Sequence, residues 1–406
     1  MGIHFLPYSE SQIRMKLLIL LFFSVFLAEI ATDIYIPCLP SLTEKFATNV
    51  TSVQLTMSFH LLGFVIGQFI YGILSDRVGR IQSLSLGMAL FFSSSFGCGV
   101  SQSIEMLIVF RFLQGLGACA CPVIALAIIK DCSSDSTSNI RLISLLTMII
   151  SLSPIMGPIF GVVILEYFGW RANFFLIGFA VVLLFLFYLM KFVNPIEAQK
   201  NKHLPFWTSS RIYFRFIFIK YLIMNAVLVS CVWVFVAEAP FILMTHFKLT
   251  SMDFVILQSM SVVSYIIGGW IANRMVGTWE AEVLLNRGLF VIILSALLLF
   301  ISSVFFLMTP FIFIFSVIIF ELGLGMARPT LVDKMMSFHV NHHGTAAAFI
   351  GTSEMVLSAL FIFLSSLYRG NGTESITALM VFAALVCLWL QIKHPSSILR
   401  KPRFLR

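Results

Sequence analysis

The fold is decided by the stretch Gly72-Ile73-Leu74-Ser75-Asp76-Arg77-Val78-Gly79-Arg80, where charged residues and glycines interrupt a strongly apolar sequence. A long apolar run lies on each side of this stretch. Glycine permits tight turns and close approaches between helices, whereas charged side chains cannot lie unpaired in hydrocarbon. We therefore expect a short loop that joins two membrane-spanning helices. The residues expected to act in this loop are Gly72, Asp76, Arg77, Gly79 and Arg80.

The composition of the whole chain is that of a membrane protein. Of 406 residues, 59% are hydrophobic and 11% are charged, and the mean hydropathy is +1.00. Ordinary soluble proteins contain about 45–50% apolar and about 25% charged residues. A helix needs about 20 apolar residues to cross a bilayer, so the chain has room for roughly a dozen spans and no sizeable soluble domain. The sequence predicts an all-α protein embedded in a lipid bilayer.

Apolar runs separated by turn residues predict twelve transmembrane helices in two six-helix bundles. The first bundle is expected to contain spans at residues 16–39, 52–74, 82–101, 104–129, 142–166 and 172–193. The second is expected to contain spans at residues 218–245, 253–274, 287–308, 311–333, 345–367 and 376–393. The predicted organisation is an N-terminal bundle at 1–193, a cytoplasmic linker at 194–217, and a C-terminal bundle with a basic tail at 218–406.

The basic residues are distributed unevenly along the chain. The net charge is +8, and most Lys and Arg residues fall in alternate loops, in the linker and in the C-terminal tail. Basic residues accumulate in the cytoplasmic loops of membrane proteins. The charge therefore indicates a multi-pass protein of the inner membrane with both termini in the cytoplasm, and not a nucleic-acid-binding protein. The chain is expected to act as a monomer.

The seven cysteines show no spacing that suits a metal ion, and they lie in or beside apolar runs. Buried free cysteines pack as small apolar side chains. No pair of nucleophile and base and no phosphate-binding loop stands out in the sequence. We therefore expect no metal, no cofactor and no enzymatic activity. His60, which falls inside a predicted span, is interpreted as a packed polar residue.

Ionisable residues within the predicted spans are costly in hydrocarbon and mark functional positions. The group comprises Glu29, Asp33, Arg111, Glu238, Glu321, Arg328 and Glu354. Carboxylates outnumber arginines in it, and a carboxyl group in an apolar cavity can bind and release a proton. Glu29 and Asp33 are four residues apart and so share one helix face. The alternative is that Asp33 lies at an outer helix end and pairs with Arg111.

Several stretches resemble patterns of the major facilitator superfamily. The loop at residues 72–80 is similar to the loop between the second and third helices of that family, with Leu84 in the pattern and Ile81 departing from a basic position. Arg111-Phe112-Leu113-Gln114-Gly115-Leu116-Gly117-Ala118 resembles the family pattern R-F-x-Q-G-x-G-A, and its glycines are expected to allow close helix packing. Thr32-Asp33-Ile34-Tyr35-Ile36-Pro37-Cys38-Leu39-Pro40 resembles the first helix of drug:proton antiporters of the Bcr/CflA type. The resemblance implies the two-bundle major facilitator fold.

The stretch Ser153-Pro154-Ile155-Met156-Gly157-Pro158-Ile159-Phe160-Gly161 resembles the antiporter pattern G-x-x-x-G-P-x-x-G-G of the same family. Ser153 and Val162 stand where that pattern has glycine. The residues that carry the likeness are Pro154, Gly157, Pro158 and Gly161. The resemblance implies a bent helix that seals one side of the cavity and favours export. The alternative is an ordinary proline-kinked span.

The resemblance also implies a cytoplasmic gate. Asp76 is expected to face the positive start of the eleventh helix near Gly344, and an arginine of the loop is expected to pair with Asp131. Such contacts would hold the transporter closed on its cytoplasmic side. The alternative is an ordinary solvated loop.

The candidate substrate-binding residues are Tyr35, Gln114, Glu238, Arg328 and Glu354. The last three are unexpected in a pump for hydrophobic drugs. They predict a polar pocket that suits a zwitterionic or multiply polar compound. The alternative is that Arg328 and Glu354 neutralise each other across adjacent helices, since buried charges are usually paired.

Together these patterns predict a proton-coupled antiporter that exports a drug-like or polar small organic molecule. Asp33, with Glu29, would bind the proton, and Arg111 would act as a fixed positive partner because arginine is not deprotonated in proteins. One alternative is an importer that moves a small metabolite together with protons. A second is a membrane receptor or enzyme that does not transport. The expected partners are a small-molecule substrate, protons and the lipid bilayer.

Overall fold

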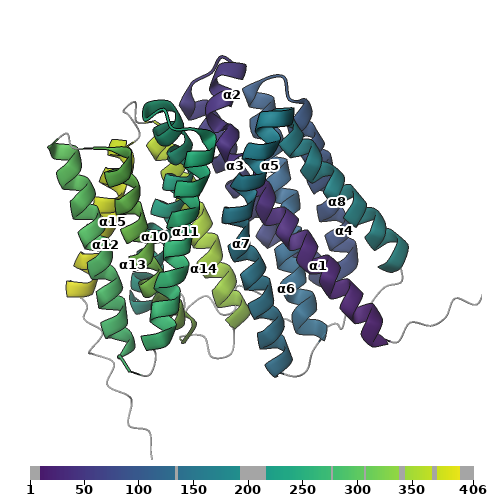
Figure 1. The fold of residues 1–406 in the computed structure, drawn as a ribbon. Coiled ribbons are helices and arrows are strands. Elements are labelled where there is room, and N and C mark those ends of the chain that lie inside the picture. The colour runs from purple at the N-terminus through teal and green to yellow at the C-terminus, as the bar shows by residue number, and fades with distance from the viewer. Residues whose placement is uncertain are drawn as a thin grey trace, which may run out of the picture. The chain divides into compact units, whose positions relative to one another are not determined.

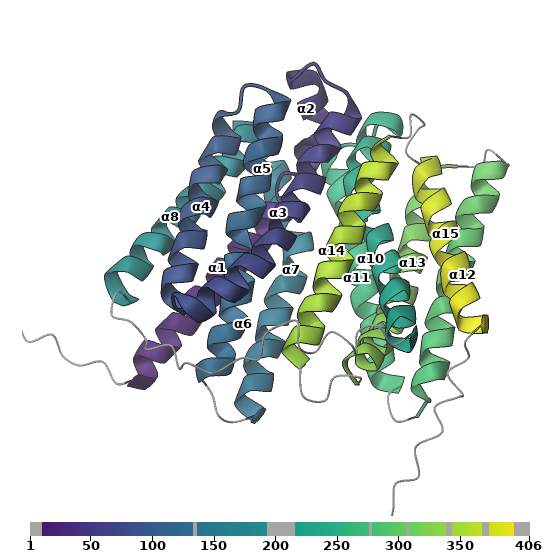
Figure 2. The same ribbon diagram turned by 180° about the vertical axis from the view of Figure 1, so that it is seen from behind.

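The computed structural model describes residues 10–132, 136–192, 216–275, 278–305, 308–337, 343–367 and 373–393. The chain divides into two compact helical units, residues 1–202 and 203–406 (Figures 1 and 2). The predicted linker at 194–217 lies almost entirely outside the described residues.

Among the residues described in the first unit, a short 3-10 segment, η1, lies between two α-helices. The elements of this unit are α1 (Glu10–Asp33), η1 (Ile36–Cys38), α2 (Leu39–Lys45), α3 (Val50–Arg77), α4 (Arg80–Val100), α5 (Ile104–Ala118), α6 (Ala120–Cys132), α7 (Ser136–Phe168) and α8 (Trp170–Phe192). Side-chain caps define two of the helix starts. The Asn49 side chain accepts a hydrogen bond from the Ser52 backbone N–H before α3, and the Ser103 hydroxyl accepts one from the Met106 N–H before α5.

In the described part of the second unit, a short π-helical segment, η3, follows the first α-helix. The elements of this unit are α10 (Phe216–Pro240), η3 (Phe241–His246), α11 (Ser251–Met275), α12 (Ala281–Val304), α13 (Pro310–Ser337), α14 (His343–Ser366) and α15 (Thr373–Lys393). α13 packs against α11 and α12, and α10 packs against α14 and α15. These neighbours bring polar residues of four helices together in the second unit.

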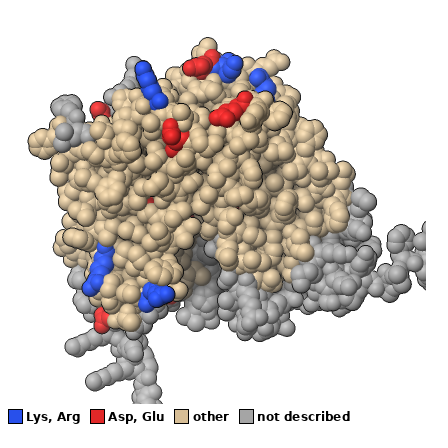
Figure 3. Space-filling model, viewed as in Figure 1, with Lys and Arg blue, Asp and Glu red and all other residues tan. Residues whose placement is uncertain are grey.

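The described residues contain 12 helical spans that are long and apolar enough to cross a membrane, which confirms the predicted fold class. Large apolar side chains cover the outside of the helices, and Phe179, Phe290 and Phe311 are each more than half exposed. Such exposure suits contact with lipid. Most of the charged side chains visible in Figure 3 lie toward its upper and lower edges, and residues other than Lys, Arg, Asp and Glu form nearly all of the surface between them.

The first predicted span, expected as one helix over residues 16–39, is interrupted in the structure. α1 ends at Asp33, and the chain then passes through η1 into the short helix α2. Pro37 and Pro40 explain the break, because proline has no N–H to donate to the preceding turn. The prediction of a continuous helix was wrong here, and the break leaves Asp33 at a helix end.

The fourth predicted span, at 104–129, is also divided. α5 ends at Ala118 and α6 begins at Ala120, so that Cys119 alone lies outside both helices. Pro122 cannot donate a hydrogen bond to the carbonyl of Ala118, which accounts for the interruption. The break follows directly after the glycines of α5.

The loop at residues 72–80 is shorter than expected. α3 continues to Arg77 and α4 begins at Arg80, so only Val78 and Gly79 lie outside helices. Gly79 has a φ of 112°, a conformation that glycine adopts without strain. Gly72 does not lie at a close helix contact, because a Cβ atom built there would meet nothing within 4 Å. The expectation of a close approach at Gly72 was therefore wrong, and the turn depends on Gly79.

Glycines do bring helices together elsewhere, as predicted for the glycines of α5. A Cβ atom at Gly115 would collide with the carbonyl of His60 on α3, and one at Gly117 would collide with the backbone of Phe91 on α4. In the second unit, a Cβ atom at Gly325 on α13 would collide with the carbonyl of Tyr265 on α11. These close crossings determine which polar side chains of neighbouring helices lie opposite one another.

Candidate functional site

Arg111 lies at the centre of a polar network inside the first unit. Its side chain is 0% exposed. Nη1 donates hydrogen bonds to the carbonyl of Ala31 at 3.1 Å and to Oε1 of Gln114 at 2.5 Å. The guanidinium lies over the ring of Tyr35, 4.0 Å from its centroid. Backbone, amide and aromatic groups therefore surround this buried cation.

Polar side chains of α3 and α4 complete the network. His60 forms hydrogen bonds with the hydroxyl of Thr32 at 3.1 Å and with the carbonyl of Arg111 at 3.2 Å. The Tyr35 hydroxyl lies 3.1 Å from that of Thr56, and the Gln114 amide donates to Ser95 at 2.8 Å. The bonds of His60 join α1, α3 and α5, which agrees with the interpretation of His60 as a packed polar residue.

Asp33 is the last residue of α1, and it is 5% exposed. Its Oδ2 accepts a hydrogen bond from the Ser153 hydroxyl at 2.6 Å. In the described part of the chain Asp33 forms no ion pair with Arg111, whose donors are directed to Ala31 and Gln114. Asp33 thus lies at a helix end, as the alternative expected, but the expected pairing with Arg111 is not present among the described contacts.

The packing of α7 on α1 explains how Ser153 reaches Asp33. Ser153, Gly157 and Gly161 are spaced four residues apart and so lie on one face of α7. A Cβ atom at Gly157 would approach the Asp33 side chain to 2.6 Å, and one at Gly161 would collide with the carbonyl of Ile34. The small residues of the antiporter-like stretch thus form the surface that receives the end of α1. Pro154 and Pro158 lie inside α7 beside this surface.

Glu29 lies one turn before Asp33 on α1 and is half-buried. Among the residues that the structure describes, no group of three or more His, Cys, Asp or Glu side chains could hold a metal ion. Glu29 is thus a second carboxyl group on the same face of α1, one turn from Asp33.

In the second unit, Arg328 and Glu354 form an ion pair with an N–O distance of 3.0 Å. Arg328 Nη1 also donates to the Tyr265 hydroxyl at 3.0 Å, and the Asn225 amide donates to Glu354 Oε1 at 2.5 Å. The cluster joins α10, α11, α13 and α14. The sequence left open whether Arg328 and Glu354 bind substrate or neutralise each other, and the structure contains the ion pair.

Two further carboxylates of the second unit have hydroxyl partners. Glu238, near the end of α10, accepts a hydrogen bond from Ser365 on α14. Glu321, on α13, accepts one from Ser261 on α11 at 3.2 Å. Both carboxylates are buried. Neither of these two hydrogen bonds involves Arg328 or Glu354.

The loop residues of the first unit form a local ion pair. Arg80 Nη1 lies 2.5 Å from Asp76 Oδ1, one turn apart, and donates to the Ser75 hydroxyl at 2.7 Å. Arg77 is exposed. Asp131 and Gly344, named as gate partners from the sequence, lie in α6 and α14, but the structure does not describe their contacts.

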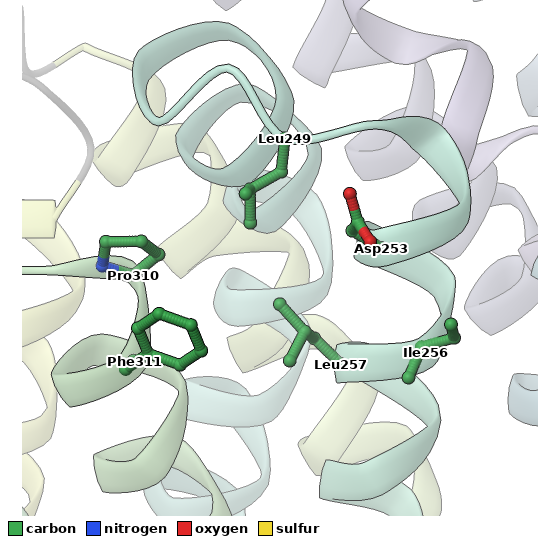
Figure 4. A pocket seen from close by; sticks show the side chains of 6 residues that line it. All are labelled: Leu249, Asp253, Ile256, Leu257, Pro310 and Phe311. Atoms are coloured by element: carbon green, nitrogen blue, oxygen red, sulfur yellow. The ribbon is translucent and has the colours of Figure 1, made fainter.

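A surface pocket of about 150 Å³ lies at the start of α11 and α13 (Figure 4). Its lining residues are Leu249, Asp253, Ile256, Leu257, Pro310 and Phe311. Asp253 caps α11 by accepting hydrogen bonds from the backbone and side chain of Thr250. The Asp253 carboxylate therefore stabilises the start of α11. The pocket is separate from the cluster of Arg328 and Glu354, because Tyr265 lies more than three helical turns further along α11.

Sequence reasoning did not identify the polar partners of the predicted residues. These partners include Ser153, Asn225, Tyr265, Ser261 and Ser365. Each is a hydrogen-bonding residue within an apolar span, and that is the signal that could have identified it. Which of them faces a charged residue depends on helix rotation, and the weak periodicity of these spans does not define it.

The comparisons with known proteins agree with this architecture. The family model described as Major Facilitator Superfamily matches residues 21–362. Multidrug resistance protein D of Escherichia coli (strain K12) is 26% identical over 387 residues, which cover 94% of this chain and 97% of that protein. A chloramphenicol resistance protein of Pseudomonas aeruginosa is 25% identical over 366 residues, covering 90% and 87%.

Solved transporters share the fold. A bacterial homologue of the human lysosomal transporter Spinster matches with a TM-score of 0.74 at 14% identity, over 94% of this chain and 96% of that chain. A D-xylose-proton symporter matches with a TM-score of 0.72 at 14% identity, over 92% and 97%. Family, curated relatives and fold agree on a multi-pass inner-membrane transporter, not an enzyme. This chain belongs to the Major Facilitator Superfamily, as its loop and helix patterns predict.

Proposed function

We propose that the protein exports a drug-like or polar small organic molecule across the inner membrane in exchange for protons. The observation that carries the proposal is the setting of Asp33. This carboxyl group is 5% exposed within a membrane-spanning unit, and its hydrogen-bond partner is the neutral hydroxyl of Ser153. Asp33 also lies at a helix end that glycines of α7 contact closely.

Burial disfavours the charged form of a carboxyl group, and one hydroxyl donor offsets only part of that cost. A carboxyl group held in this way can bind a proton when it is shielded and release it when water reaches it. Asp33 is therefore assigned as the proton carrier, with Glu29 as a second protonatable group one turn away.

Arg111 supplies a positive charge that does not titrate. Its hydrogen bonds to Ala31 and Gln114 and its contact with Tyr35 hold the guanidinium near the end of α1. We assign Arg111 to proton coupling, where it favours release of the proton by stabilising the nearby charged carboxylate. Tyr35 and Gln114, which contact this cation, are assigned to substrate binding.

The direction of transport is proposed from the relatives and from α7. Curated relatives are named as multidrug and chloramphenicol resistance proteins, which fits export. The small residues Gly157 and Gly161 and the prolines Pro154 and Pro158 match the antiporter pattern. Substrate and proton would exclude each other, so that the inward movement of a proton is exchanged for the outward movement of substrate.

The cytoplasmic gate and the topology belong to the same proposal. The ion pair of Asp76 and Arg80, with Arg77, Gly72 and Gly79, would form the gate, and Asp131 would contribute to it. Both termini would face the cytoplasm, because the basic loops and the basic tail favour that side. The protein would act as a monomer.

Purified protein in liposomes tests the proposal, with chloramphenicol as the first probe of a panel of antibiotics. With an acidic lumen, protons that leave the liposome should drive the probe into the lumen. Asp33→Asn should abolish this uptake, whereas Asp253→Asn should retain it, because Asp253 is an exposed helix cap. Uptake that requires an acidic exterior would instead indicate symport, and uptake by Asp33→Asn equal to that of the unmodified protein would disprove the proton assignment.

A further inference from the structure

Four helices of the second unit converge on one charged cluster. The close crossing of α11 and α13 places the backbone of Tyr265 against Gly325, and Arg328 lies three residues further along α13. The Tyr265 hydroxyl accordingly accepts a hydrogen bond from Arg328 Nη1 at 3.0 Å. α10 packs against α14, which brings the Asn225 amide to Glu354.

The hydrogen bonds within the cluster are distributed unevenly. Glu354 accepts bonds from Arg328 Nη2 at 3.0 and 3.2 Å and from Asn225 at 2.5 Å. In contrast, Arg328 Nε and Asn225 Oδ1 are buried and have no hydrogen-bond partner among the described residues. One unpaired donor and one unpaired acceptor therefore flank the Glu354 carboxylate. Buried polar atoms without partners are costly, and each requires an explanation.

The cluster is also accessible on one side. The Arg328 side chain is 33% exposed, whereas that of Glu354 is 6% exposed and Asn225 is 0% exposed. The exposed third of the Arg328 side chain is therefore where a ligand would first contact the cluster. The Tyr265 hydroxyl accepts from Arg328, so its own proton remains free to be donated to a ligand.

We propose that Arg328, Glu354, Asn225 and Tyr265 form a binding site for an amphoteric small molecule, one that carries both an anionic and a cationic group. The inference rests on the proposed transport function, and it specifies the chemical class of the substrate. The anionic group accepts from Arg328 Nε and the Tyr265 hydroxyl. The cationic group donates to Asn225 Oδ1 and to the Glu354 carboxylate.

The charge balance of the cluster favours such a ligand. Arg328 and Glu354 together carry no net charge, and a zwitterion adds none. A ligand with a single charge would leave one buried charge uncompensated, which is costly in apolar surroundings. The site should therefore prefer a zwitterion to the anion or the cation of the same size.

Four probes with one aromatic body test this preference. They are phenylalanine, phenylalanine methyl ester, N-acetylphenylalanine and N-acetylphenylalanine methyl ester, which are zwitterionic, cationic, anionic and neutral. Binding to the purified full-length protein in nanodiscs is measured by thermophoresis at about pH 5.5, where the amino group of the ester is protonated and the carboxylates of the other probes are ionised. The zwitterion should bind about tenfold more tightly than each of the other probes, since charge-assisted hydrogen bonds are the strong ones.

Variants assign each half of the ligand to its partner. Arg328→Gln should remove the advantage given by the carboxylate of the probe, and Glu354→Gln the advantage given by its ammonium group. Tyr265→Phe keeps the ring and should weaken binding of the carboxylate-bearing probes about threefold, the usual size of one net hydrogen bond. Lys334→Gln is the matched control, because it removes a cation of the same helix whose 2.9 Å ion pair with Glu282 is separate from the cluster.

Equal binding of all four probes, or no binding by any of them, would overturn the proposal. The same holds if Arg328→Gln and Glu354→Gln lower the unfolding temperature but leave the probe preference unchanged, which would make the pair purely structural. Binding is measured without a proton gradient, so loss of proton-driven uptake with the preference intact would refute the transport proposal alone.

Discussion

The Ser153 hydroxyl donates a 2.6 Å hydrogen bond to the Asp33 carboxylate and so connects the middle of α7 with the end of α1. Ser153 stands where the antiporter pattern has glycine, and Gly157 and Gly161 continue the same helix face. The contact therefore couples the position of α7 to the state of the carboxyl group. Protonation of Asp33 or movement of α7 would each alter this bond.

Ser153→Ala tests that coupling. The variant keeps a small side chain at the contact but removes the one hydroxyl donor to the carboxylate, so the ionised state that must follow proton release is less stable. We expect proton-driven uptake into liposomes to slow by about ten- to a hundredfold, as loss of one hydrogen bond to a charged group predicts. Ser153→Thr, which retains the hydroxyl, should keep most of the rate, and a fall as large as that of alanine would point to packing.

Arg111→Lys tests the buried cation. Lysine retains the charge but loses the planar contact with Tyr35 and the two directed bonds from one nitrogen. We expect the free energy of unfolding to fall by about 1–3 kcal/mol, measured as a lower unfolding temperature in detergent. Arg171→Lys is the control, because Arg171 is an exposed cation over Trp170. An equal effect of both substitutions would contradict a special role for Arg111.

Gly115→Ala and Gly72→Ala form a matched pair. A Cβ atom at Gly115 would collide with the His60 carbonyl, whereas one at Gly72 would meet nothing within 4 Å. Gly115→Ala should therefore separate α3 from α5 and lower the unfolding temperature, with a cost of about 1–3 kcal/mol for overpacking. Gly72→Ala should leave the unfolding temperature unchanged or raise it slightly. The reverse order would show that the helix contacts are misassigned.

Asp76→Asn tests the gate. The ion pair with Arg80 is partly exposed, with 43% of the Asp76 side chain accessible, so its loss should change stability by about 0–1 kcal/mol. If the pair holds the gate, the substitution should slow uptake while leaving the affinity for the transported antibiotic largely intact. Binding and uptake measured on the same preparation separate these effects. A loss of affinity equal to the loss of uptake would assign Asp76 to the binding site.

The fold could be predicted because hydropathy alone defines a helix that crosses a bilayer. The two interrupted spans show where this signal stops. Apolar residues continue through Pro37 and Pro122, and hydropathy does not register the missing N–H groups that end the helices there. The predicted spans at 16–39 and 104–129 correspond to the spans Leu17–Lys45 and Ile104–Ile129, but the helix breaks inside them were not predicted, although the prolines were visible in the sequence.

The site could be predicted less completely than the fold. Asp33, Arg111 and Glu354 stand out as charges in apolar runs, and the structure places all three inside their helical units. Their partners could not be predicted from residue type, because a serine in a membrane helix most often bonds its own backbone. The bond from Ser153 to Asp33 exists because the glycines of α7 bring α1 close. The pairing of Arg328 with Glu354 likewise depends on which helices are neighbours.

The central claim is that Asp33 couples proton movement to transport, and two assays on one set of liposomes test it most directly. Asp33→Asn should abolish chloramphenicol uptake driven by an acidic lumen, while exchange of labelled for unlabelled chloramphenicol without a gradient continues. Glu29→Gln added to this variant should not restore the driven uptake. Driven uptake that survives the double substitution, at the rate of the unmodified protein, would contradict the account.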